Sequence, residues 1–423
     1  MANTVTVSAQ SVLGGLALGY QLLWGPLRKV SAVQLFVGTE PSEQAPIDAR
    51  HLLAVIAESW SAQSPRLILS ASSPELVQDL LSHATTDVPD SDPWISIHSR
   101  LLVNPALAQH VHHAHQRGVP LVWRGEPGER PPPSLSTCFT KHMISLTAEE
   151  ALTGLRVSLR KFNSAGSAPA TEARGLASPV EQGQIYEGLA SWVLTEHCLD
   201  QQGAWAVAGW PMEDVLHGYR HQRMQPAHST IVQLMKAVDA DQSVEAIEHL
   251  LSEEPILTYR FMRYINSVGL GLRTEVESIR HGLLVLGYSL FQTWLAEQLP
   301  HATSDANLQP VRTALVIRAR LMDHLLDAGD SDDLRREVYL CGLLSQIDLL
   351  LGEPLTTALL RFPLPERIVS AILNNSGPYA PYLEVATALE SANTHLTHIL
   401  CETHELAFED VNRALLRTLS SIR

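Results

Sequence analysis

The chain has 423 residues, of which 45% are apolar and 18% are charged, a balance typical of a folded protein with about two or three domains. Its 30 Lys and Arg side chains against 45 Asp and Glu give a net charge of −15, which argues against nucleic acid or an anionic membrane surface as the main partner. Because no apolar run reaches the ~18 residues that span a bilayer, we also expect no membrane insertion.

Cysteine usage and the N-terminus indicate a reducing compartment. The four cysteines are far apart in the sequence, so they form neither a disulfide framework nor a zinc-binding CxxC pattern: Cys138, Cys198, Cys341 and Cys401. The first residues lack the basic segment of a secretory signal. We therefore predict a cytoplasmic protein.

From residue 1 to 212, short apolar runs alternate with stretches that have helical periodicity. The runs lie at 5–9, 33–37, 66–71, 94–98, 119–123, 143–146 and 204–208, with a further one possible at 172–176. The helical stretches lie at 47–60, 74–83, 106–116, 148–162 and 184–199. Strands that alternate with helices favour a mostly parallel sheet, and this number of strands predicts an α/β barrel of the TIM type over 1–212.

The second half of the chain, 217–423, is predicted to be an all-helical domain. Apolar residues recur there at spacings of three and four, as in Ile231, Leu234, Met235 and Val238. This spacing places them on one face of an amphipathic helix. The same pattern continues through the following segments, and no run in this half resembles a strand.

The sequence contains few of the motifs that usually mark metal-binding, nucleotide-binding or catalytic sites. His110, His112, His113 and His115 lie on one predicted helix, where residues three apart share a face. Such pairs bind a transition metal only with further ligands from elsewhere, and we interpret them as an exposed polar face. The sequence contains neither a GxGxxG nor a GxxxxGK[ST] phosphate loop, and it contains no GxSxG elbow.

The C-terminal half resembles the HDOD domain, the helical "HD-related output domain" of bacterial signalling proteins. The resemblance covers about 217–400 and rests on motifs at 254–260 (EPILTYR), 263–267 (RYINS), 276–282 (VESIRHG), 342–348 (GLLSQID) and 364–368 (LPERI). The last two motifs are similar to the form found in hybrids that carry an N-terminal EAL domain. In active HD-type enzymes a His-Asp pair binds metal, and Ser345 and Gln346 stand at those positions.

The N-terminal half resembles, in eroded form, such an EAL domain, whose active members hydrolyse cyclic di-GMP. The segment 19–24 (GYQLLW) is similar to the signature of the family, and 208–210 (AGW) to its closing segment. The resemblance implies that metal- and phosphate-binding residues are replaced at Gln21, Gly25, Ser70, Arg124-Gly125 and Ser178, while Glu181 remains. Hydrolysis with two metal ions needs several converging carboxylates, so we expect neither a bound metal or other cofactor nor EAL-type catalysis.

We predict an interaction surface on the helical domain, beside the helix end at 263–267 and the loop that follows it. The candidate residues are Arg263, Asn266, Ser267, Leu270, Leu272, Arg273 and Arg280. Alternatives remain open for each kind of side chain. Asn266 and Ser267 either cap the helix or contact a partner, the leucines either enter the core or face a ligand, and the arginines either support the turn or attract an acidic partner.

The resemblance implies a non-catalytic bacterial signal-transduction protein that acts on other signalling proteins through protein–protein contacts, and it leaves a homodimer possible. One alternative is a receptor for cyclic di-GMP or another nucleotide, for which Gly25 removes a cation and Arg124 partly restores one. A second alternative is a metal-dependent phosphohydrolase that uses His281, His324 and Asp348 of the helical domain.

Overall fold

The computed structural model describes residues 12–38, 47–85, 92–164, 177–221, 225–272, 274–326 and 331–422. The chain forms two compact units. One comprises Met1–Pro211 together with Thr387–Arg423, and the other comprises Met212–Ala386. The first unit carries all the strands found in the described residues, and the second is helical.

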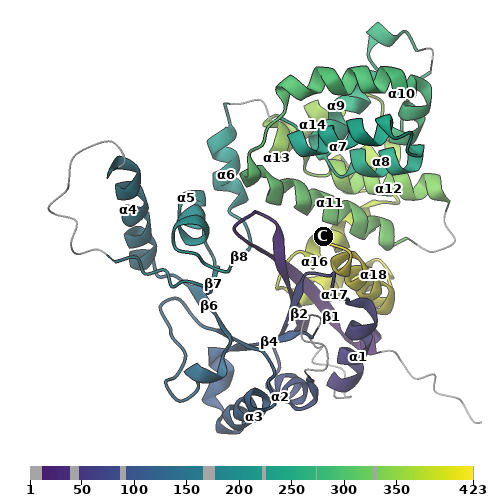
Figure 1. Ribbon diagram of the computed structural model, residues 1–423. Coiled ribbons are helices and arrows are strands. Elements are labelled where there is room, and N and C mark those ends of the chain that lie inside the picture. The colour runs from purple at the N-terminus through teal and green to yellow at the C-terminus, as the bar shows by residue number, and fades with distance from the viewer. Residues whose placement is uncertain are drawn as a thin grey trace, which may run out of the picture. The chain divides into compact units, whose positions relative to one another are not determined.

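The first unit is built on a closed eight-stranded barrel, which confirms the predicted α/β barrel (Figure 1). Its strands are β1 (Ala17–Trp24), β2 (Val30–Gly38), β3 (Arg66–Ala71), β4 (Trp94–His98), β5 (Leu121–Arg124), β6 (Lys141–Ser145), β7 (Ile185–Glu187) and β8 (Ala206–Ala208). Strands β2 to β8 pair in parallel, whereas β1 is antiparallel to both β2 and β8. The reversed strand β1 therefore closes the ring.

Two of these strands differ from the sequence prediction. Strand β1 lies where the pattern gave only an apolar segment, because almost all its residues are buried and its sequence lacks the usual alternation. Strand β7 has three residues and occupies the start of a stretch, 184–199, that was predicted to be helical. The predicted strand at 5–9 and the possible one at 172–176 lie outside the described residues.

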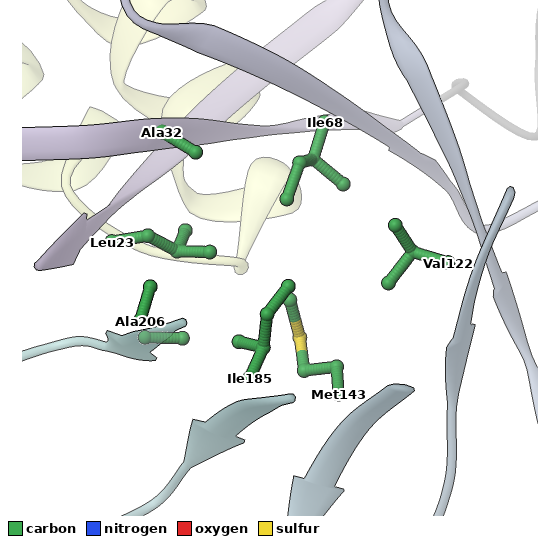
Figure 2. Packing of buried hydrophobic residues seen from close by; sticks show 8 residues of the cluster. Leu23, Ala32, Ile68, Val122, Met143, Ile185 and Ala206 are labelled. Atoms are coloured by element: carbon green, nitrogen blue, oxygen red, sulfur yellow. The ribbon is translucent and has the colours of Figure 1, made fainter. Parts of the chain in front are cut away.

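The interior of the barrel is packed with apolar side chains from successive strands. Figure 2 shows seven of them directed toward one another: Leu23, Ala32, Ile68, Val122, Met143, Ile185 and Ala206. These side chains are fully buried. The barrel is therefore a filled core rather than a pore.

Helices surround the barrel at α1 (Ala49–Ser59), α2 (Pro74–His83), α3 (Pro105–Gln116), α4 (Ala148–Ser164) and α5 (Trp192–Glu196). The first three begin at side-chain caps, in which Asp48, Ser73 and Asn104 each accept a hydrogen bond from a backbone N–H of the first turn. Proline at the first position of α2 and α3 suits a turn whose N–H groups have no helical partner.

The C-terminal helices α17 (Thr394–Thr403) and α18 (Phe408–Ser420) pack with the barrel, beside β1 and β2 (Figure 1). The buried Asn412 amide donates to the carbonyl oxygens of Leu13 at 2.8 Å and Leu16 at 2.7 Å. The predicted helical domain 217–423 thus extends further than the compact helical unit, whose last residue is Ala386. Helical periodicity alone could not reveal which unit a helix packs against.

The helical unit contains α6 (Met212–Tyr219), α7 (His228–Asp239), α8 (Val244–Ser252), α9 (Pro255–Ile265), α10 (Ile279–Gln298), α11 (Gln309–His324), α12 (Asp332–Leu344), α13 (Ile347–Leu351), α14 (Leu355–Leu359), α15 (Glu366–Asn374) and most of α16 (Ala380–Leu389). Phe261, Phe291 and Trp294 pack their rings within its core. A buried ion pair joins Arg312 to Glu254 at 3.0 Å. Among the described helices, none is long and apolar enough to cross a membrane.

We predict that Gly19→Ala destabilises the first unit by about 1–3 kcal/mol, because a Cβ there would lie 2.2 Å from the carbonyl oxygen of Ser391. Gly14→Ala is the matched control, since its Cβ would meet nothing within 4 Å. Urea unfolding of the full chain measures both changes. An unfolding midpoint for Gly19→Ala equal to that of the control would contradict the close approach of the C-terminal segment to β1.

Candidate functional site

The strand ends of the barrel surround a cavity of about 460 Å³. Its lining comes from β1, β2, β4, β5, β6, β7 and the segment before α17, all within the first unit. The lining residues are Gln21, Phe36, His98, Arg124, Gly125, Glu126, Pro127, Ser145, Glu187, Gly188, Glu390, Ser391 and Ala392. In parallel α/β barrels the carboxyl ends of the strands form the functional face, so we take this cavity, here named the barrel mouth, as the candidate site.

An ion pair occupies the centre of the polar lining. The Arg124 Nε atom lies 3.1 and 3.0 Å from the two carboxylate oxygens of Glu187. The Ser145 hydroxyl donates to the same carboxylate at 2.9 Å. Since the Glu187 residue is only 8% exposed, its charge depends on these donors rather than on water. The two oxygens that would otherwise bind a cation are thus already engaged by protein groups.

The rim of the barrel mouth carries a second charged group. Glu126 forms an ion pair with Arg100 at 2.5 Å and lies 3.7 Å from the Nε2 atom of His98. Burial lowers the pKa of His98, and the positive charge of Arg124 lowers it further. We therefore expect His98 to be neutral near pH 7, so that it adds little positive charge to the mouth.

Two of the predicted residues on the first strands take different places. Gln21 lines the barrel mouth, whereas Gly25 lies in the tight turn between β1 and β2, where its N–H donates to Lys29, and does not line it. Ser70 lies at the end of β3 and accepts a 2.8 Å hydrogen bond from the fully buried Gln34 amide.

Gln34 is a polar residue that the sequence analysis missed. It is the register partner of Gln21 on the neighbouring strand, so both side chains project from the same face of the sheet. Its position inside an otherwise apolar run, 33–37, was the available signal. A glutamine in a buried strand needs a polar partner, which here is Ser70.

The predicted positions Ser178 and Glu181 do not line the barrel mouth. Ser178 contacts the Nε2 atom of His197 at 2.9 Å, and Glu181 lies 3.6 Å from Arg130, so neither lines the cavity. Glu187, at the end of β7, is the acid that does. The signal was an acid placed directly before Gly188, but recognising it requires a strand at 185–187. Arg124 and Gly125 line the mouth as predicted.

The two HD-type positions of the helical unit have structural surroundings. Ser345 follows the last residue of α12, donates to the Gly342 carbonyl at 2.8 Å and accepts from Arg318 at 3.1 Å. Gln346 directly precedes α13. Among the described residues, no group of three or more His, Cys, Asp or Glu side chains is placed to hold a metal ion.

The predicted interaction residues divide into buttressing and exposed ones. Asn266 clamps the loop after α9, since its amide donates to Val276 at 2.8 Å and accepts from the same residue at 2.9 Å. Arg280 pairs with Glu245 at 2.5 Å. Asn266 therefore supports the turn, which is one of the two open alternatives, whereas Arg280 joins α10 to α8. Ser267 and Leu272 are exposed and Leu270 is half-buried, while Arg273 lies outside the described residues. Arg263 is exposed on α9.

We expect Arg124→Ala to destabilise the protein by about 1–2 kcal/mol, because it leaves a nearly buried Glu187 carboxylate without its cation. Arg100→Ala serves as the control, with an expected loss below about 0.5 kcal/mol, since that side chain is 75% exposed. Adding Glu187→Gln to Arg124→Ala should recover part of the loss. Thermal and urea unfolding test this, and additive single and double changes would argue against a coupled pair.

Comparison with known proteins gives matches to parts of the chain. Residues 224–357 match the model of the HDOD domain family. The cyclic di-GMP phosphodiesterase CdgJ of Vibrio cholerae serotype O1 is 20% identical over 198 residues, 47% of this chain and 46% of that protein. The uncharacterized protein YuxH of Bacillus subtilis is 24% identical over 155 residues, 36% of this chain and 37% of that protein. The matches thus span less than half the length of these curated relatives.

Two solved structures show weak similarity. The MmoQ response regulator of Methylococcus capsulatus is 18% identical with a TM-score of 0.39, covering 46% of this chain and 99% of that one. BlrP1 of Klebsiella pneumoniae, in a complex with manganese and cyclic di-GMP, is 13% identical with a TM-score of 0.29, covering 47% of this chain and 55% of that one.

The family match covers helices α7 to α13 and the start of α14, so the helical unit of this protein carries an HDOD domain.

Proposed function

We propose that this protein is a non-catalytic regulator of bacterial signalling, in which an EAL-like barrel has lost its metal site and the helical unit binds partner proteins. The observation that carries the proposal is the Arg124–Glu187 ion pair at the barrel mouth. The HDOD domain and the name of the Vibrio cholerae relative supply the signalling context. That relative is named as a phosphodiesterase, so loss of catalysis is the point at which this chain would differ from it.

The ion pair opposes metal catalysis for an electrostatic reason. A divalent cation would have to displace the Arg124 guanidinium from Glu187, and it would then lie beside that fixed positive charge. Glutamine and serine at Gln21, Gln34 and Ser70 offer neutral oxygens only. Two-metal hydrolysis of a phosphodiester needs several anionic ligands around the ions, and this mouth supplies them poorly.

The charge of the barrel mouth also disfavours the nucleotide-receptor alternative. Its lining contains one arginine, Arg124, against three glutamates, Glu126, Glu187 and Glu390. The guanidinium of Arg124 already accompanies Glu187, which leaves an excess of negative charge facing the cavity. A doubly anionic dinucleotide needs cationic donors, so this balance of charge gives the receptor alternative little support.

Exposed apolar side chains support protein binding by the helical unit. Leu284, Val285 and Leu290 on α10 are 59%, 43% and 52% exposed, and Val268 in the loop after α9 is 98% exposed. Helix α10 is interrupted at Gly287, whose φ of 71° is non-helical. Large apolar side chains that remain exposed on a folded protein are candidates for protein contacts.

The catalytic half of the proposal is tested with the purified full chain and cyclic di-GMP in the presence of Mn²⁺ or Mg²⁺. We expect no hydrolysis above the protein-free blank, because Arg124 already holds the Glu187 carboxylate and Arg100 pairs with Glu126. Turnover that is abolished by Glu187→Ala and retained in Glu181→Ala would contradict the proposal. Glu181 is a suitable control because it does not line the barrel mouth.

The binding half is tested by affinity capture from the native cell with the full chain. A double variant, Leu284→Asp with Leu290→Asp, should lose its captured partners, since these side chains are exposed and their replacement leaves the fold intact. Leu360→Asp is the matched control, at a position 72% exposed in the same unit. Identical partner sets for all three proteins would place the contact elsewhere and overturn this part of the proposal.

A further inference from the structure

A second cavity, of about 580 Å³, lies wholly within the helical unit. Arg260 and Arg263 form one wall, and they share a face of α9 because they are three residues apart. The end of α13, the connection after it and the segment after α14 contribute Leu351, Glu353 and Arg361. The remaining lining comes from Gln225, Tyr259 and His301.

The cavity is cationic within an acidic protein. Its lining carries three arginines against one glutamate, whereas the whole chain has a net charge of −15. Arg361 pairs with Glu353, and Arg260 donates to Gln298 at 3.2 Å. Arg263 has no ion-pair partner among the residues that the structure describes. The balance of charge is therefore positive, and at least one guanidinium has donors to spare.

The walls of the cavity are fixed by hydrogen bonds that do not depend on a ligand. The Tyr259 hydroxyl donates to the Ala358 carbonyl at 3.0 Å, which ties α9 to α14. Arg312 donates to the Gln225 carbonyl at 2.6 Å and thereby holds the segment before α7. Gly352 ends α13 with a φ of 65°, which directs the chain toward Glu353. The arginines thus lie on a preformed frame, so that little ordering is needed on binding.

We propose that this cavity binds a small organic phosphate that carries at least two negative charges, such as a nucleoside diphosphate. Guanidinium groups bind phosphate oxygens through paired N–H donors, and the arginines of α9 and of the segment after α14 would bind the phosphates of a diphosphate. The cavity volume falls within the usual range for small-molecule sites. Leu351 offers apolar contact to the organic portion. The inference stands apart from the proposed function, since it concerns neither the barrel nor α10.

The test is isothermal titration calorimetry of the full chain with ADP, inorganic pyrophosphate and citrate. ADP and pyrophosphate should bind, and citrate more weakly. Arg263→Ala should weaken ADP binding about tenfold or more, as expected for a lost hydrogen bond between charged groups. Glu353→Gln should strengthen it, because the change removes the one acid of the lining and releases Arg361. Circular dichroism and thermal melting report the fold of each variant.

Arg220→Ala is the matched control, because this arginine is exposed in the same unit and lies outside the cavity. Loss in Arg263→Ala, gain in Glu353→Gln and no change in Arg220→Ala would support the site. Absence of ADP and pyrophosphate binding would overturn it. So would an equal loss in the control, citrate binding as tight as pyrophosphate, or binding of an acidic peptide such as polyglutamate in place of the phosphates.

Discussion

Closure of the barrel by the reversed strand β1 is the constraint on which the barrel mouth depends. Strand β1 hydrogen-bonds to β2 along its length and to β8 at its end. A closed ring leaves no open sheet edge, and it gathers the carboxyl ends of the parallel strands at one mouth. Residues as distant in sequence as Gln21, Arg124 and Glu187 therefore line one cavity. Without closure of the barrel, Arg124 and Glu187 would not line one enclosed cavity.

The barrel mouth and the cavity of the helical unit have opposite electrostatic character. In the barrel mouth, Arg124 forms an ion pair with the nearly buried carboxylate of Glu187, so its positive charge is matched within the protein. In the cavity of the helical unit, three arginines lie against one glutamate, and Arg263 has no ion-pair partner among the described residues. A cation that is matched within the protein maintains structure, whereas an unmatched one is available to an external anion.

Much of the architecture could be predicted from periodicity, because alternating strands and amphipathic helices each have a distinct period. Strand β1 escaped prediction because it is buried on both faces, and β7 because three residues give no measurable period. Because β7 was not predicted, Glu187 was not among the candidate residues. Only a strand ending at Glu187 shows that this carboxylate, rather than Glu181, faces Arg124. Likewise, nothing in the sequence shows whether Asn266 and Arg280 bond within the protein, as the structure has them, or contact a partner.

The return of residues Thr387–Arg423 to the first unit makes the helical unit an insertion within the barrel unit's chain. A ribosome releases the N-terminal end first, so the eight strands emerge well before α18 does. Until then the carbonyl groups of Leu13 and Leu16 lack Asn412, and the face of β1 lacks its covering segment. Translation of the helical unit therefore delays completion of the barrel unit, and premature termination anywhere after β8 would leave that unit unfinished.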